Sequence, residues 1–294
     1  MKEESIELTK YLKLIFRNTR IIVLFSFLIG ISGFLTSLLL DDIYKSSAVL
    51  MPTSSSDVGM SQSLGGMASM VGIELGDSNT DKTKLANQIL ISLDFYKKLI
   101  NDDSELLINL VAIKKYNKNT KKLEINERIY DNKNNIWKYY GADSNNIPSF
   151  QDTHGDFLNL LSFNQDIKTK FVHVSVKHKS PYFAYELINK IIDQLNEEIR
   201  IFDNTIAKKS LEFIEIKSSD ISSASFRKTI NELYNSQLHK LMLTEVNDEY
   251  AFRIIETPVV PEKKFQPSRL IILILSTIFG FICSLAYIIF YRSD

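Results

Sequence analysis

The stretch KFVHVSVKHKSPYFAYELINKIIDQLNEEIR, residues 170–200, decides how this chain folds. Valine fills every second position from Val172 to Val176, which predicts a strand with one apolar face. Ser180 is placed to cap a helix, and Pro181 takes the first helical position, where proline is tolerated. The apolar seam that follows recurs at the three- and four-residue spacing of a helix. Its members are Tyr185, Ile188, Ile192, Leu195 and Ile199.

The helical pattern continues to residue 217 without proline or glycine, which is longer than a compact domain normally encloses. A helix over 181–217 would be about 55 Å long, from the usual rise per residue. After a serine-rich break, a second pattern predicts a helix over about 222–246, antiparallel to the first because the connection is short. Together they predict a long extended helical hairpin. The apolar positions of the second helix are Phe226, Ile230, Leu233, Leu238, Leu241 and Met242.

Two apolar blocks lie near the ends of the chain, at residues 21–40 and 270–291, and neither contains a charged residue or a histidine. Because about 20 apolar residues suffice to cross a bilayer as a helix, each block predicts a transmembrane helix. The first block exceeds the apolar region of a cleaved signal peptide, and no convincing cleavage site precedes Asp41. Buried core helices are disfavoured as an alternative, because they usually keep a polar stripe.

Basic residues before the first block predict that the tail, residues 1–20, is cytoplasmic. Two spans then return residues 292–294 to the cytoplasm and leave 41–269 as a periplasmic domain. Lys263, Lys264 and Arg269 conflict with this orientation, because they flank the second block on the outer side. We give more weight to the N-terminal bias, since the first helix usually sets topology. That bias consists of Lys10, Lys13, Arg17 and Arg20.

Other segments predict an α/β layer next to the bilayer. IYKSSAVLMP (43–52) and EYAFRIIETP (249–258) each predict a strand, and residues 81–100 predict one amphipathic helix. Residues 53–81 predict a flexible surface loop, or a loop that orders against a neighbouring subunit through Met60, Met67 and Met70. The polar middle, 101–164, predicts short helices and loops. The fold class is therefore α+β, with two transmembrane helices flanking a periplasmic α/β base domain and the helical hairpin.

The residue types that carry chemistry form no recognisable site. His154, His173, His178 and His239 lack the spacing of metal ligands, and the single cysteine, Cys283, lies inside the second apolar block. No phosphate-binding loop or nucleophile motif occurs. A formal net charge of zero argues against a nucleic-acid binder. We therefore expect no catalytic residue, no cofactor and no metal.

The stretch TPVVPEKKFQPSR, residues 257–269, holds three of the six prolines. Pro258, Pro261 and Pro267 favour an extended backbone and prevent a continuous helix. We interpret the stretch as a semi-rigid strut between the domain and the second span. The simpler interpretation is an ordinary helix stop, which accounts for one proline.

Small residues in both spans permit close helix approach. These are Gly30 and Gly33 in the first span, with Ser276, Gly280 and Ser284 in the second. Glycine is common in transmembrane helices, so there are two interpretations: a specific contact between the helices, or the ordinary glycine content of such segments.

In their order along the chain, these segments resemble the Wzz-type chain-length determinants, the polysaccharide co-polymerases of lipopolysaccharide O-antigen synthesis. The resemblance is carried by YKSSAVLMP, by HKSPYFAYELIN, and by LHKLMLTEVNDEYAFRIIETPVVPEKK with the proline-rich approach to the second span. It covers both ends and most of the chain, whereas residues 101–165 add little. It implies a homo-oligomer in the inner membrane that carries no catalytic residues.

The resemblance also implies what the protein does. Such a protein sets the modal number of repeat units that a Wzy-type polymerase adds to an undecaprenyl-linked glycan. The chain is thus expected to regulate the chain length of O-antigen or a related surface polysaccharide. A non-enzymatic component of a polysaccharide export system is the alternative, and an envelope enzyme acting on glycan is a third class.

Overall fold

The computed structural model describes residues 16–53, 78–101, 104–118, 120, 122–138, 147–218 and 224–291. It divides into a terminal unit, residues 1–44 and 263–294, and a central unit, residues 45–262. Our predictions on Lys10, Lys13 and the methionines of segment 54–77 lie outside the described residues.

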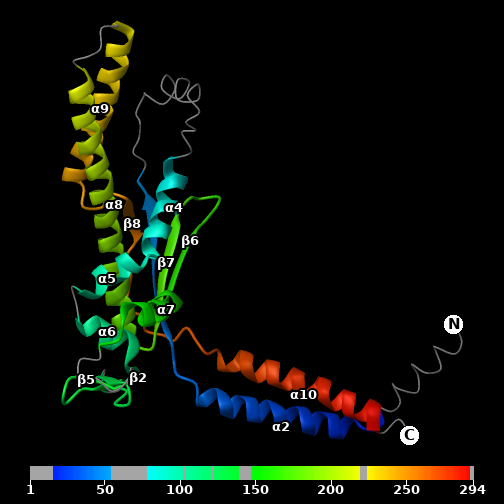
Figure 1. Ribbon diagram of the computed structural model, residues 1–294. Helices are drawn as coiled ribbons and strands as arrows, with labels where there is room; N and C mark the ends of the chain where they lie inside the picture. Colours follow the sequence, from blue (N-terminus) through cyan, green and yellow to red (C-terminus); the bar gives the residue numbers. More distant parts are fainter. Residues whose placement is uncertain are drawn as a thin grey trace, which may run out of the picture. The chain divides into compact units, whose positions relative to one another are not determined.

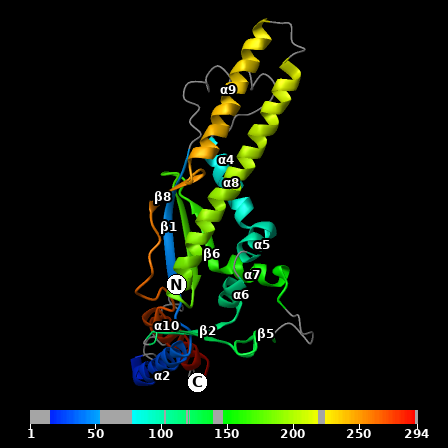
Figure 2. The same cartoon turned by 90° about the vertical axis from the view of Figure 1, so that its left-hand side faces the viewer.

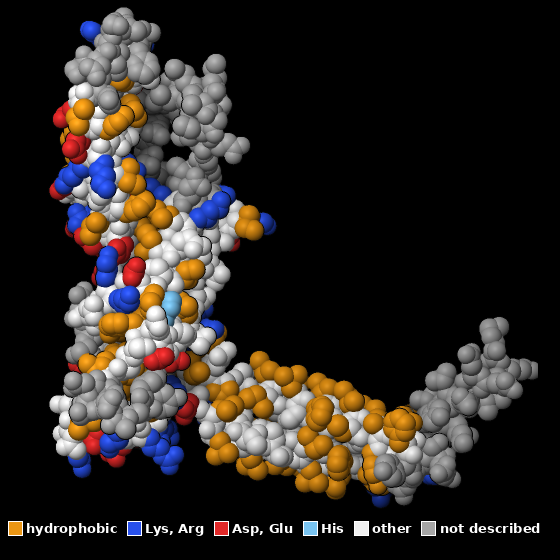
Figure 3. All heavy atoms as spheres, viewed as in Figure 1, with side chains coloured by type: hydrophobic (Ala, Val, Ile, Leu, Met, Phe, Trp, Pro, Cys, Tyr) orange, Lys and Arg blue, Asp and Glu red, His pale blue; other side chains and the backbone are white. Residues whose placement is uncertain are grey.

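The terminal unit consists of α2 (Thr19–Leu38) and α10 (Arg269–Tyr291), which pack against each other (Figure 1). Their outward side chains are apolar and exposed, as in Phe27 at 64% and Phe290 at 84% (Figure 3). Exposed apolar surface of this extent is costly in water and favourable in lipid. Both helices are long and apolar enough to cross a membrane.

A four-stranded sheet with the order β6-β7-β1-β8 forms the framework of the central unit. β6 (Leu161–Gln165) and β7 (Val172–His178) pair antiparallel, and so do β1 (Tyr44–Pro52) and β8 (Phe252–Glu256). The predicted alternation holds in part in β7: the three valines are buried and His173 is exposed, but Ser175 on the other face is buried as well. The two strands predicted over 43–52 and 249–258 thus lie side by side as β1 and β8.

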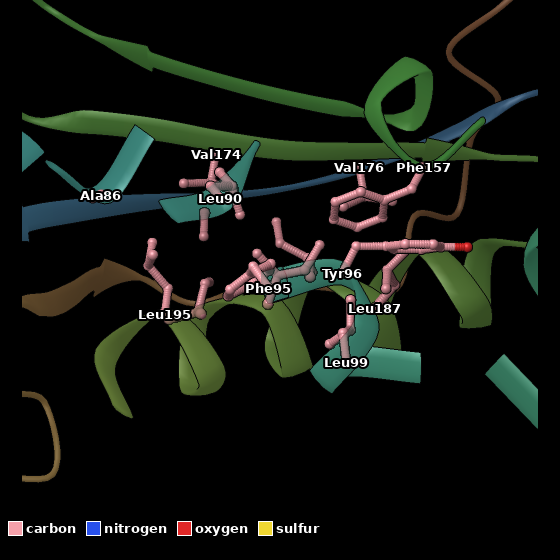
Figure 4. Close-up of a cluster of buried hydrophobic side chains, with 14 of the residues drawn as sticks. Ala86, Leu90, Phe95, Tyr96, Leu99, Phe157, Val174, Val176, Leu187 and Leu195 are labelled. Atoms are coloured by element: carbon pink, nitrogen blue, oxygen red, sulfur yellow. The ribbon is translucent and has the colours of Figure 1, made fainter. Parts of the chain in front are cut away.

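Helices pack on this sheet around one hydrophobic core. The helices are α4 (Ser78–Leu90), α5 (Leu93–Asn101), α6 (Ser104–Val111), α7 (Phe150–Leu160) and the first half of α8 (Pro181–Ser218). Figure 4 shows Phe95, Tyr96 and Leu187 meeting Val176 and Phe157 between the helices and the sheet. Each fully buried side chain of this size contributes on the order of 2 kcal/mol to stability.

Our prediction of one helix over 81–100 is wrong, because a turn at Ile91 and Ser92 separates α4 from α5. The Ser92 Oγ accepts a hydrogen bond from the Phe95 amide at 3.1 Å, so Ser92 caps α5. The break changes direction between the two helices and allows each to place its own apolar face on the core.

The middle of the chain contains two small hairpins that the sequence did not reveal. β2 (Ile113–Asn117) pairs with β3 (Lys122–Ile125), and β4 (Tyr130–Asp131) pairs with β5 (Ile136–Trp137). The single tryptophan, Trp137, packs edge-on against the Tyr130 ring, with 4.9 Å between ring centroids.

The predicted helical hairpin is confirmed: α8 runs out of the core and α9 (Ala224–Val246) returns beside it (Figure 2). The predicted N-cap is present, since the Ser180 Oγ accepts a hydrogen bond from the Phe183 amide at 3.2 Å. The seam of α8 differs from our prediction at Tyr185, which is 38% exposed. The core-facing residues are Phe183, Ala184, Leu187, Ile188, Ile191, Ile192, Leu195 and Ile199.

Candidate membrane junction and helical hairpin

The chain that leaves α2 pairs with the chain that enters α10, so the two spans are tied at one end. The Ile43 amide donates to the Gln266 carbonyl at 2.9 Å, and the Ile43 carbonyl accepts from the amides of Phe265 at 2.7 Å and Gln266 at 3.2 Å. These residues belong to the terminal unit, together with both helices. We call Asp42, Ile43, Lys264, Gln266 and Arg269 the junction.

Asp42 places one carboxylate between two cations of the junction. Its Oδ1 lies 2.9 Å from Lys264 Nζ and 3.4 Å from Arg269 Nη2. All three side chains are partly buried, with exposed fractions of 27%, 27% and 36% for Asp42, Lys264 and Arg269. Partial burial reduces solvent screening, so these pairs are stronger than fully exposed ones. The neighbouring Lys263 is exposed.

The three predicted strut prolines lie in non-helical backbone. Pro258 is buried, Pro261 and Pro267 are half-buried, and Pro267 follows Gln266 through a cis peptide bond. The Val259 carbonyl accepts a hydrogen bond from the Ser46 Oγ at 2.9 Å, so this part of the stretch is fixed to β1 within the central unit. The strut as a mechanical element remains a prediction.

The three predicted glycines of the spans lie against side chains or backbone of the opposite helix. A Cβ added at Gly30 would meet the Thr277 Oγ1, and one at Gly33 would meet the Ser276 Cβ at 2.5 Å. One added at Gly280 would meet the Ile29 Cβ at 2.9 Å and the Ser26 Cα at 3.0 Å. Contacts this short leave no space for a larger side chain without movement of a helix.

The serines of this interface bond mainly within their own helices. The Ser276 Oγ donates to the Leu273 carbonyl at 3.0 Å and comes within 3.4 Å of the Gly30 carbonyl on the other helix. The Ser284 Oγ, in a residue only 3% exposed, donates to the Phe281 carbonyl at 2.8 Å. A specific packing role for the five predicted residues stays a prediction.

The outer half of the hairpin carries a large apolar surface that the described residues leave exposed. Between the helices it buries little more than Ala207 and Ile214, since two helices alone cannot enclose all their apolar faces. Figure 3 shows apolar side chains among charged ones on the visible face of α8 and α9. The exposed members are Ile201, Phe202, Ile206, Phe213, Ile216, Leu233, Leu238, Met242 and Val246.

Comparison with known proteins tests the resemblance stated above. The family model described as "Wzz: Chain length determinant protein" matches residues 4–103. The resemblance to the Wzz-type chain-length determinants is confirmed. The match begins before the first span and runs through β1 and α5. A comparison with curated proteins finds none that matches.

Two solved structures are similar to this chain at low identity. One is a full-length bacterial polysaccharide co-polymerase, with 12% identity, a TM-score of 0.36 and 96% of each chain covered. The other is a fragment of WzzB, a polysaccharide co-polymerase from Salmonella Typhimurium, with 12% identity and a TM-score of 0.28. That alignment covers 76% of this chain and 99% of the fragment.

The described residues contain no group of three or more His, Cys, Asp or Glu side chains placed to hold a metal ion. The four histidines lie apart in the fold: His173 and His239 are exposed, His154 stacks near Tyr96 and Phe157, and His178 is buried.

Proposed function

We propose that this chain is a non-enzymatic inner-membrane scaffold that sets the modal chain length of O-antigen or a related surface polysaccharide. The observation that carries the proposal is the match to the chain-length determinant family over residues 4–103. Two helices able to cross a membrane, one near each end of the described chain, support it. The α8–α9 hairpin supports it further, because it is built to present surface.

In this proposal the scaffold is a homo-oligomer. Exposed side chains such as Phe202 at 45%, Phe213 at 63% and Ile216 at 62% would be covered by neighbouring copies. Burial of such a surface is worth roughly 25 cal/mol per Å² of apolar area, before the cost of association is subtracted. A soluble monomer rarely exposes so many large apolar residues on one element.

The membrane helices would meet a Wzy-type polymerase that elongates an undecaprenyl-linked glycan. Both termini would be cytoplasmic and the central unit periplasmic, following the basic residues that precede α2. The prolines at 258, 261 and 267 would act as a strut that keeps the spans in a fixed relation to the oligomer. A reporter fused next to Trp137 tests this topology, and cytosolic activity of that fusion would refute it.

The decisive experiment is deletion of the gene, followed by separation of the surface polysaccharide as a ladder on a gel. We expect the modal band to disappear while polymer still reaches the surface, and the intact gene to restore it. Loss of surface polymer with normal polymer inside would instead favour a component of an export system. Turnover of a sugar substrate by the purified protein alone would favour an envelope enzyme.

A further inference from the structure

A buried charged cluster lies at the root of the hairpin, where α8 leaves the core. We call it the root cluster, and it consists of Lys82, Asp203, Lys240 and Tyr250. These residues come from α4, α8, α9 and the turn between α9 and β8. Asp203 is 7% exposed and Tyr250 is 4% exposed, whereas Lys82 and Lys240 are half-buried.

Asp203 uses each carboxylate oxygen for a different partner. Its Oδ1 lies 2.8 Å from Lys240 Nζ, and its Oδ2 accepts a hydrogen bond from the Tyr250 hydroxyl at 2.8 Å. One side chain of α8 therefore holds both α9 and the turn that leads from α9 to β8. Charge-assisted bonds of this kind are roughly twice as strong as neutral ones.

Lys82 extends the cluster to α4 and to the end of β1. Its Nζ lies 4.9 Å from the centroid of the Tyr250 ring and donates to the Thr53 carbonyl at 3.1 Å. Thr53 is joined in turn to the α9–β8 turn, because its amide donates to the Ala251 carbonyl at 2.9 Å. Burial lowers the pKa of Lys82, and the nearby Asp203 carboxylate opposes that shift.

Further bonds on the same side of α8 strengthen this connection. The Asn196 Oδ1 accepts from the amides of Ala251 at 2.9 Å and Phe252 at 2.8 Å. Arg200 donates to the Thr244 carbonyl at 3.1 Å, at the end of α9, where a cation is favoured by the helix dipole. These polar contacts overlap the end of the apolar seam of α8, because Asn196 precedes Ile199 and Arg200 follows it.

The charges of the cluster make Asp203 the residue on which the others depend. One carboxylate faces two ammonium groups, so its removal leaves two like charges close together in a partly buried place. Breaking a buried pair by removing one partner leaves an uncompensated charge, which costs more than the pair was worth. The loss would act on α4 and α9 at the same time.

We propose that the root cluster fixes the hairpin to the sheet domain and couples α9 to α4 and the end of β1, with Asp203 as the positioning residue. A shift of one of these elements thereby alters the hydrogen bonds and ion pairs that hold the others. The coupling is a property of the central unit alone. Its service to chain-length control rests on the proposed function.

Amide hydrogen exchange of the full-length protein in detergent tests the coupling. Lys82→Met should speed exchange about tenfold in residues 240–246 of α9, and Lys240→Met should do the same in residues 82–90 of α4. Asp203→Asn should speed exchange in both segments. If each variant speeds exchange only in its own helix, the coupling is refuted.

Two kinds of control keep this test interpretable. Asp94→Asn makes the aspartate change at an exposed ion pair, and Lys98→Met makes the lysine change at a pair in which Lys98 is 58% exposed; both lie outside the cluster and should leave both segments unchanged. Tyr250→Phe removes one hydroxyl only, so it should fold even if Asp203→Asn fails to fold. It should speed exchange in both segments, by less than Asp203→Asn does. Its failure to affect both segments would overturn the proposal.

The polysaccharide ladder separates this inference from the proposed function. In the deletion strain, the intact gene should restore the modal band, whereas Asp203→Asn at equal protein level should give a broadened one. An unchanged band with Asp203→Asn would refute the positioning role. Failure of the intact gene itself would refute the proposed function, and hydrogen exchange would still decide the coupling.

Discussion

The buried histidine at the end of β7 predicts a specific sensitivity to acid. His178 is 5% exposed, its Nδ1 accepts a hydrogen bond from the Ser180 amide at 3.0 Å, and its ring lies 4.4 Å from that of Phe183. Burial lowers the pKa of His178 to about 4. Protonation at Nδ1 also requires the Ser180 bond to break, which would disturb the start of α8.

The sign of the effect follows from the two states of the protein. The unfolded chain takes up the proton near pH 6.5, whereas the native state resists it until about pH 4. The native state is therefore fully favoured above pH 6.5 and loses stability as the pH falls towards 4, where the loss levels off. A shift of this size corresponds to about 3 kcal/mol over the whole window, and to about 2 kcal/mol by pH 5.

Thermal unfolding of the full-length protein in detergent measures this loss. Trp137 is the only tryptophan and packs against the core, so its fluorescence reports on the central unit. A loss of about 3 kcal/mol should lower the Tm of a unit of this size by ~6–12 °C between pH 7.5 and 4, in addition to the effect of carboxylates. The quantity to compare is the fall in Tm between pH 7.5 and 4 in the wild type and in His178→Asn.

In His178→Asn the amide oxygen stands near the position of Nδ1 and can accept the Ser180 bond, but it does not titrate. The variant should be less stable at neutral pH, because the ring contact with Phe183 is lost, and its Tm should fall less on acidification. His173→Asn is the matched control, since His173 lies exposed on the same strand. Parallel Tm curves for the wild type and His178→Asn would refute the reasoning.

Two further predictions concern the junction and the spans. Replacing Pro258, Pro261 and Pro267 with glycine should broaden the polysaccharide length distribution. Glycine at the exposed non-proline positions 257, 262 and 263 is the control and should leave the distribution unchanged. An unchanged ladder for the proline variant at normal protein level would count against the strut. Gly30→Leu should force α2 and α10 apart at a cost of about 1–3 kcal/mol. The distance between spin labels at the exposed Leu39 and Leu270 should then increase, whereas the exposed control Ala286→Leu should not change it. The same label distance in Gly30→Leu and the wild type would count against close packing.

The sequence was most informative where one physical pattern runs for many residues. The alternating valines of β7, the Ser180 cap and the long apolar seam of α8 fixed a strand, a turn and a helix in sequence order, because each signal is local. The two apolar blocks likewise predicted α2 and α10. The signal failed at Ser92, because an amphipathic pattern can continue across a turn when both flanking helices face the same core.

Contacts between distant segments left no trace that a single sequence could reveal. Asp203, Lys240 and Tyr250 are ordinary residues of polar helix faces and turns, and only the fold brings them together. The hairpins around Trp137 are short, so their alternation is too brief to be recognised. Tyr185 fits the helical spacing, yet neighbouring positions face the core. The helical repeat alone does not fix which side of a helix is buried, because several sides carry residues at that spacing.

The junction gives a structural role to cations that conflict with the expected topology. The positive-inside rule counts Lys and Arg rather than net charge, so the pairing of Lys264 and Arg269 with Asp42 does not by itself change the topological argument. It does give both cations a contact, because Lys264, before α10, and Arg269, its first residue, pair with Asp42 in the segment after α2. The backbone hydrogen bonds between Ile43 and Gln266 likewise connect the segment after α2 to the segment before α10. Both candidate spans are thus joined at one end, so they can act as one element, as the proposed scaffold would require.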